Sequence, residues 1–339
     1  MNALPNRRVE DWKYSDLRNA VDEVTVVAAP VAAWSVLSAD GGVEIADLPE
    51  IAPRGTHGAM AETALARAKA GPYVRVPRGE AGAIHLALTE GGHGRAVIVV
   101  EEGASLFLRE TVSARDFANV AADIVLGAHA RLTHLRFAPA NAVAQVADYA
   151  VRVAGGASYI AHFANFGGRL SRTELHIALE GEGAQAHLSG VAVLEGSHAD
   201  VTTHVTHSVA DTTSTQLFKY VAGGHGRGVY QGKVTVAPGA DGSDSRQTAK
   251  GILLHDRAEI NLKPELEILA DDVKCAHGAA VGDLDADSLF YLRSRGIPQT
   301  EARALLMRAF LGDAVEAIAD EAARADVWRA VEAALESLS

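Results

Sequence analysis

The chain has 339 residues, of which 48% are hydrophobic and 22% are charged, as is ordinary for a globular protein with a sizeable core. Its formal net charge of -12 argues against a nucleic-acid-binding surface, and its single cysteine excludes an intramolecular disulfide. No window approaches the roughly 20 apolar residues of a membrane span, and the first 18 residues lack the apolar core of a signal peptide. We therefore expect a cytoplasmic protein that binds neither membranes nor nucleic acids.

Residues 1–85 are expected to form a mixed, partly helical region. They open with a polar amphipathic segment at 7–20, which a proline-containing, loop-rich stretch follows. Residues 60–70 are rich in strong helix formers, and Gly71-Pro72 ends that helix.

Residues 86–284 consist of short β-type runs separated by glycine turns, without a convincing amphipathic helix, which disfavours βαβ folds. Gly-Ala pairs recur between the runs at spacings of 24, 29, 27 and 56 residues, the last being two steps of 28. Such a period is typical of a solenoid in which every coil adds one rung to stacked parallel sheets. We predict a mainly β fold, a right-handed parallel β-helix, in preference to a jelly roll. The pairs are Gly103-Ala104, Gly127-Ala128, Gly156-Ala157, Gly183-Ala184 and Gly239-Ala240.

Residues 285–339 are predicted to be helical. Asp285 or Asp287 can cap a first helix, a second starts near Pro298, and a third spans about 326–338. Helices at the end of a solenoid can cap its open edge, which would otherwise invite pairing with another chain.

The only cysteine, Cys275, precedes His277 by two residues in a stretch that favours extended backbone. Because side chains alternate across a strand, the thiol and the imidazole are expected on one face, as two ligands for a soft or borderline metal ion. Two ligands do not close a tetrahedral site, so the others must come from elsewhere, for example from another chain. A lone cysteine is more often a small buried apolar residue. Lys274 and His277 favour a thiolate if the sulfur is exposed, and burial does the opposite.

Other motifs of catalysis are missing from the sequence. A glycine-rich stretch at 223–234 fails as a phosphate-binding loop, because Arg227 stands where its first glycine belongs and Val234 replaces its hydroxyl residue, so we expect no ATP on this chain. None of the 14 histidines has His-Glu-x-x-His spacing. His204 and His207, an odd number of residues apart on a predicted strand, are expected on opposite faces.

Five specific motifs lie close together in the second half of the chain: Gly-Val-Tyr-Gln-Gly-Lys at 228–233, Gln-Thr-Ala-Lys at 247–250, Asn-Leu-Lys-Pro-Glu-Leu-Glu-Ile at 261–268, Asp-Asp-Val-Lys-Cys-Ala-His-Gly at 271–278 and Leu-Phe-Tyr-Leu-Arg-Ser-Arg-Gly-Ile at 289–297. Together they resemble a known family, the SufB/SufD proteins of iron–sulfur cluster assembly. The opening at residues 5–18 and the single cysteine resemble its SufD branch in particular.

The resemblance implies a non-enzymatic scaffold subunit that works with a SufB-like subunit and a SufC-like ATPase. His277, with Cys275 as a less certain companion, would contribute to a transient iron–sulfur cluster shared with the SufB-like subunit. The family has also been associated with reduced flavin at the level of the complex. The sequence does not decide whether the chain forms a homodimer in isolation.

The resemblance further implies that part of residues 286–312 contacts the SufC-like ATPase. The alternatives are a solvated helix end for the arginines and intramolecular packing for the apolar stripe. The predicted partner-binding residues are Arg293, Arg295, Leu305, Leu306 and Phe310.

Two other classes of function fit the sequence less well. A β-helical carbohydrate-active enzyme would usually carry a secretion signal and a cluster of acids with Arg or Lys on one sheet face, and the sequence shows neither clearly. A self-assembling solenoid without chemistry is disfavoured by the Cys-x-His motif and the specific terminal helices.

Overall fold

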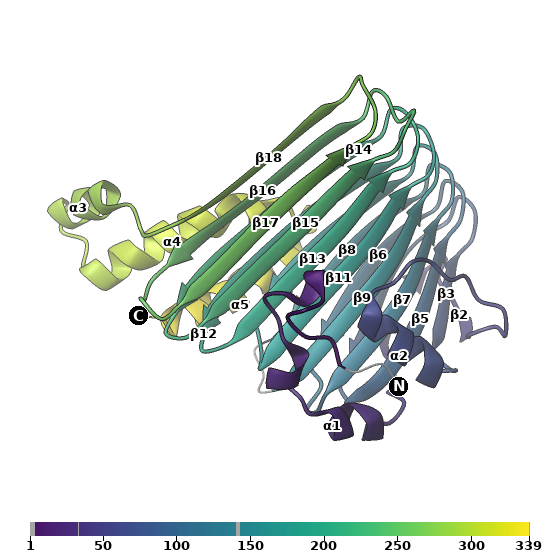
Figure 1. Ribbon diagram of the computed structural model, residues 1–339, viewed down its shortest axis with the longest axis horizontal. Coiled ribbons are helices and arrows are strands. Elements are labelled where there is room, and N and C mark those ends of the chain that lie inside the picture. The colour runs from purple at the N-terminus through teal and green to yellow at the C-terminus, as the bar shows by residue number, and fades with distance from the viewer. Residues whose placement is uncertain (1–3, 33, 140–142, 339) are drawn as a thin grey trace.

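The computed structural model describes residues 4–32, 34–139 and 143–338. Its centre is a solenoid of two nine-stranded sheets, and from β3 onward the chain alternates between the sheets from strand to strand (Figure 1). Neighbouring strands are parallel except at the first coil, where β1 pairs antiparallel with β4 and β2 with β3. The predicted mainly β, parallel β-helical fold is confirmed.

Within each sheet the strands are stacked in the order in which they occur along the chain, and the intervening strands belong to the other sheet. Sheet A contains, from one edge to the other, β17 (Glu259–Ile268), β15 (Arg227–Val236), β13 (His198–His207), β11 (Leu170–Leu179), β9 (Ala144–Val153), β7 (Ala118–Leu126), β5 (Gly92–Val100), β3 (Pro72–Val76) and β2 (Glu44–Asp47). Sheet B contains β1 (Ser35–Gly41), β4 (Ala81–Leu88), β6 (Ser105–Val112), β8 (Arg131–Ala138), β10 (Ser158–Asn165), β12 (Gln185–Glu195), β14 (Thr213–Gly223), β16 (Asp244–Leu253) and β18 (Lys274–Gly282).

The Gly-Ala pairs lie in the short loops that lead from sheet A to sheet B. In four of the five pairs the glycine has a positive φ between 64° and 79°, and the alanine after it is buried. A left-handed residue costs glycine little, and the small alanine fits inside the corner. The exception is Gly127-Ala128, where His129 takes the left-handed conformation (φ 58°) and Ala130 is the buried alanine.

The space between the sheets is filled by stacked apolar side chains. One column of register partners in sheet B runs from Leu106 through Leu132 and Tyr159 to Ala186, all of them buried. Each fully buried large apolar side chain contributes roughly 1.5–3 kcal/mol to folding. The interior core therefore holds the coils in register.

The N-terminal region covers the outer face of sheet A. It contains two 3-10 helices, η1 (Glu10–Trp12) and η2 (Leu17–Asn19), and two α-helices, α1 (Glu23–Ala28) and α2 (Ala59–Arg67). Trp12 and Leu17 are buried in one apolar cluster with residues of β9 and β11. The helix predicted at 60–70 corresponds to α2, which packs on β5 and β7 (Figure 1).

The C-terminal region comprises α3 (Ala286–Ser294), α4 (Gln299–Glu316) and α5 (Glu321–Glu336). Asp285 caps α3 as predicted, because its Oδ1 accepts a hydrogen bond of 2.7 Å from the Ser288 N–H. The third helix begins earlier than predicted, because Asp320 caps it and accepts from the Ala323 N–H.

These helices do not cap the end of the solenoid, contrary to the prediction. Helices α4 and α5 lie against the outer face of sheet B over β12 and β14, where Leu311 and Val315 share an apolar cluster with Val193 and Val221. The sheet face therefore covers only part of the apolar stripe of α4 and leaves Leu305 exposed. The strands of the last coil, β17 and β18, keep open edges (Figure 1). No helix among the described residues has the length and apolar character that crossing a membrane requires.

Candidate functional site

Cys275 and His277 both lie on β18, the last strand of sheet B. Their register partners on β16 are Ser245 and Gln247, whose side chains are buried inside the solenoid. Cys275 and His277 therefore share the inward face of the open end, as the strand period predicted. Cys275 is half-buried against the interior core, whereas His277 is exposed.

Burial decides the protonation of the cysteine. It raises the pKa of the Cys275 thiol, and the neighbouring Asp244 carboxylate acts in the same direction. At neutral pH the residue is therefore a neutral thiol in the isolated chain, so a thiolate must be stabilised by a metal ion or by a partner.

The two side chains continue columns of register partners that run into the solenoid. Beneath Cys275, Ser245 is hydrogen-bonded to Ser214 (2.9 Å between the hydroxyl oxygens), and Ser214 lies 2.9 Å from Nε2 of His207. Beneath His277, Gln247 accepts a hydrogen bond of 3.1 Å from the Tyr230 hydroxyl. The column beneath Cys275 is apolar in the middle coils, up to Ala186, and becomes polar at Ser214 and Ser245. The polar side chains of this column are therefore confined to the coils next to Cys275.

The two edges of the last coil differ. On β17 the Glu259 N–H points toward the neighbouring strand β15, because it donates to the carbonyl oxygen of Gly226. Since N–H groups alternate in direction along a strand, the even-numbered residues of β17 direct theirs toward the open edge. Pro264, which has no N–H, falls in the outward set, and charged side chains flank it. Proline and charge are known to protect an edge strand from pairing.

The edge of β18 has no such protection. Lys274 donates to Ser243 O, so the N–H groups of Cys275, His277 and Ala279 face outward. After Lys274 the strand contains only small, apolar or histidine residues. This strand can therefore accept another strand along the Cys275 and His277 backbone.

The predicted partner-binding residues do not form a single exposed patch. Arg293 and Arg295 are exposed on and just after α3, where the Arg295 guanidinium lies 5.2 Å from the centre of the Tyr291 ring. Leu305 is 43% exposed and Leu306 is half-buried. Phe310 packs instead against the sheet B cluster.

Helix α3 itself projects away from the solenoid (Figure 1). It buries no residue, and its Phe290 and Tyr291 are 75% and 56% exposed. Sequence reasoning did not single out these two aromatic side chains, although a helix of nine residues with none of them buried carries an unusual apolar surface.

A second group of chemically interesting side chains lies on the outer face of sheet A, where Glu174, His176 and His204 come together. His176 and His204 are register partners on β11 and β13, 28 residues apart, which is the step already visible in the Gly-Ala repeat. Applying that step to the histidines would have found the pair. The expectation that His204 and His207 point to opposite faces is confirmed, since His207 is hydrogen-bonded inside the solenoid.

Comparison with known proteins agrees with this architecture. The family described as "SUF system FeS cluster assembly, SufBD core domain" matches residues 84–310. The chain belongs to this family. The SufBD match thus covers the parallel coils from β4 through β18 together with α3 and most of α4.

The matches to individual SufBD relatives span a smaller share of the relative than of this chain. The iron–sulfur cluster assembly protein SufD of Escherichia coli is 34% identical over 72% of this chain and 56% of its own. The SufBD family protein slr0076 of Synechocystis is 31% identical over 66% of this chain and 52% of its own, and the chloroplastic protein ABCI7 of Arabidopsis thaliana is 30% identical over 72% and 53%. The chain thus spans about half the length of the curated relatives it matches.

Proposed function

We propose that this chain is a non-enzymatic scaffold subunit for iron–sulfur cluster assembly and that a SufB-like subunit pairs with its last coil. The observation that carries the proposal is the unprotected edge of β18, which has Cys275 and His277 on the inward face of the same strand. A partner strand added to this edge would bring its own side chains beside the thiol and the imidazole. The incomplete ligand pair would then become a complete site for a transient cluster.

His277 is the more suitable of the two ligands. It is exposed, while Cys275 is half-buried and its thiol is kept protonated by burial. Iron and sulfide are the cargo of this site and need not rest on the isolated chain.

A SufC-like ATPase is the second proposed partner, at α3 and the start of α4. The exposed Phe290, Tyr291 and Leu305 offer apolar area, and Arg293 and Arg295 offer polar anchors at its border. ATP hydrolysis is assigned to that partner. Replacing Phe290 and Tyr291 by alanine should abolish capture of the ATPase without loss of the SufB-like subunit.

The test is co-expression with SufB-like and SufC-like subunits and anaerobic purification through a tag on this chain. Failure of both subunits to co-purify would overturn the scaffold proposal. His277→Ala should leave the complex intact and reduce its iron and acid-labile sulfide to background. His225→Ala, on an exposed loop residue, is the matched control and should retain the cluster.

The docking edge has a separate test. Ala279→Pro removes one outward N–H of β18 and reproduces on this strand the protection that Pro264 gives β17. It should weaken binding of the SufB-like subunit at least about tenfold, equivalent to roughly 1.4 kcal/mol. Ala279→Val keeps the N–H and should bind normally. Equal binding by the proline and valine variants would place the interface elsewhere.

A further inference from the structure

We propose that Glu174, His176 and His204 form a binding site for a divalent first-row transition-metal ion on the outer face of sheet A. The site lies on β11 and β13, on the opposite face of the solenoid wall from the interior that Cys275 and His277 adjoin. It therefore stands independently of the cluster-assembly proposal.

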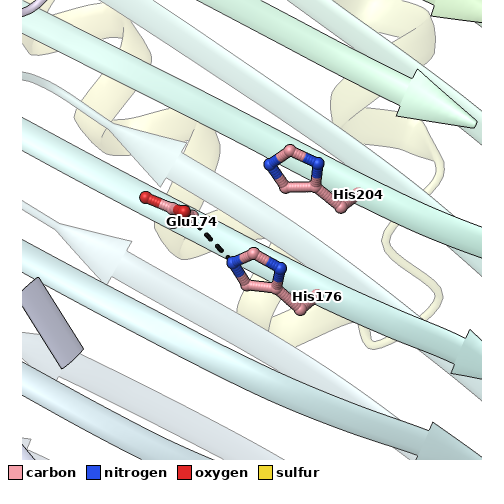
Figure 2. Close-up of side chains that lie close together, drawn as sticks. All are labelled: Glu174, His176 and His204. Atoms are coloured by element: carbon pink, nitrogen blue, oxygen red, sulfur yellow. Dashed lines mark hydrogen bonds and ion pairs between the residues drawn. The ribbon is translucent and has the colours of Figure 1, made fainter. Parts of the chain in front are cut away.

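The three side chains are brought together by the solenoid register. Glu174 and His176 are two residues apart on β11, so they share a face, and His204 is the register partner of His176 on the next coil. The imidazole rings are stacked with their centres 4.7 Å apart and 8° between their planes. One ligand atom from each residue lies within 4.8 Å of the others (Figure 2). Coordination at about 2.1 Å requires the rings to rotate about χ2 toward a common point.

The carboxylate of Glu174 is held in position from behind. Its Oε2 accepts a hydrogen bond of 2.9 Å from Arg172, and Arg172 is in turn fixed by Asp200 (2.7 Å) and by the Trp12 ring 4.2 Å away. Oε1 is left to face His176 at 3.1 Å. The Arg172 guanidinium thus places a positive charge directly behind the carboxylate of Glu174.

His204 supplies the observation that points to a ligand. Its Nε2 is buried and has no hydrogen-bond partner among the described residues, and the nearest carboxylate, that of Asp11, is 3.7 Å away. This nitrogen is therefore available as a ligand atom. A neutral imidazole with a free nitrogen is the form that binds metal ions.

A neighbouring histidine shows what a purely structural arrangement looks like on this face. The side chain of His57 is fully buried, and both of its nitrogens are satisfied, Nδ1 by Asp148 at 2.5 Å and Nε2 by Asp123 at 2.9 Å. His57 therefore has no ring nitrogen left to bind a ligand. The contrast with the unpartnered Nε2 of His204 distinguishes a ligand site from an internal ion pair.

The proposed site is accessible from solvent. His176 and His204 line a cavity of about 450 Å³, whose walls include Arg54 and Arg152. Two imidazoles and one carboxylate are a donor set for Zn²⁺, Co²⁺ or Fe²⁺, and three protein ligands leave positions open toward the cavity. Water or an anion attracted by the two arginines would fill those positions.

The experiment measures metal binding in a Cys275→Ser/His277→Ala background, so that the terminal strand contributes no signal. Titration with Co²⁺ should develop ligand-field absorption with a stoichiometry of one, and calorimetry should give the same stoichiometry for Zn²⁺. His204→Ala should weaken both metals at least about tenfold, since loss of even a supporting group costs that much. His225→Ala is the matched control and should bind as the background does.

Glu174→Gln is a second variant that keeps the shape of the side chain, and it should also lose at least about tenfold in affinity. Circular dichroism of each variant verifies that the fold persists. The proposal is overturned if the background binds no Co²⁺, or if a folded His204→Ala protein binds as tightly as the background. Neither result would bear on whether the unmodified chain forms a complex with SufB-like and SufC-like subunits.

Discussion

The last two coils of the solenoid, β15 with β16 and β17 with β18, have the same architecture, but the side chains of the first are mostly buried and those of the second are mostly exposed. Most residues of β15 are buried, including Val229 and Tyr230, whereas no residue of β17 is buried, and β18 has only Cys275 half-covered. The two coils differ in one respect, that the last coil has no further coil stacked upon it. Burial in a solenoid is therefore a property of the stack, and the uncovered coil is the surface at which we propose that a SufB-like subunit docks.

The largest expected effect comes from truncating paired positions on these coils. Tyr230 is fully buried and stacked 4.8 Å from the Phe218 ring, while its register partner Leu262 on β17 is half-buried. Tyr230→Ala should cost about 3–5 kcal/mol of unfolding free energy, and Leu262→Ala only about 1 kcal/mol, because a half-exposed site leaves little cavity. Chemical denaturation measures both. Similar costs would mean that the last coil is covered in solution, for example in a homodimer.

The second prediction concerns the N-terminal region, which covers the outer face of sheet A but not the last coil. His57 of this region is hydrogen-bonded to Asp123 on β7 and Asp148 on β9. Burial alone would lower the pKa of His57, but its hydrogen bonds to Asp123 and Asp148 raise it to about 9. Because the folded pKa lies above the unfolded value of 6.5, the stabilisation is complete below about pH 6.5 and is lost as the pH rises through 9. Thermal unfolding followed from pH 6 to pH 10 should lose up to about 3 kcal/mol from this group.

His57→Gln tests the assignment. The variant should be less stable than the parent at pH 6.5 and should show a flatter decline toward pH 10. A decline as steep as that of the parent would assign the pH dependence to other groups.

The smallest effect is expected at Cys275, in the exposed coil. Burial and Asp244 both raise the pKa of this thiol, so its alkylation should be slow at pH 7. The rate should continue to rise with pH at values where the rate of an ordinary free thiol has already levelled off. Asp244→Asn should speed the reaction a few-fold at pH 8. A thiol that reacts faster than free cysteine at pH 7 would contradict this account of the locus.

Much of the fold was predictable because a solenoid repeats its signals. The Gly-Ala turns revealed the coil step, although His129 shows that a residue other than glycine can take the left-handed position. The stripe of α4 predicted a helix but not the surface that covers it, because an apolar stripe does not specify which apolar face it meets. The helices therefore turned out to lie on sheet B rather than over the open end.

The candidate site was predictable only in part. The strand period placed Cys275 and His277 on one face, yet whether burial or nearby cations control the thiol depends on how the coil beneath is packed. The group around His204 was missed because its members are distant in sequence and carry no motif. Only the register between coils brings them together.

Pro264 bears on how large an assembly built from this chain can become. If both strands of the last coil could accept partners, a second solenoid could continue the stack, and a third could follow on the second. With the β17 side blocked, a neighbour can join at β18 but cannot extend both sheets. In the proposed docking mode, growth would therefore stop at a pair, because Pro264 lacks the N–H that a further strand on β17 would need.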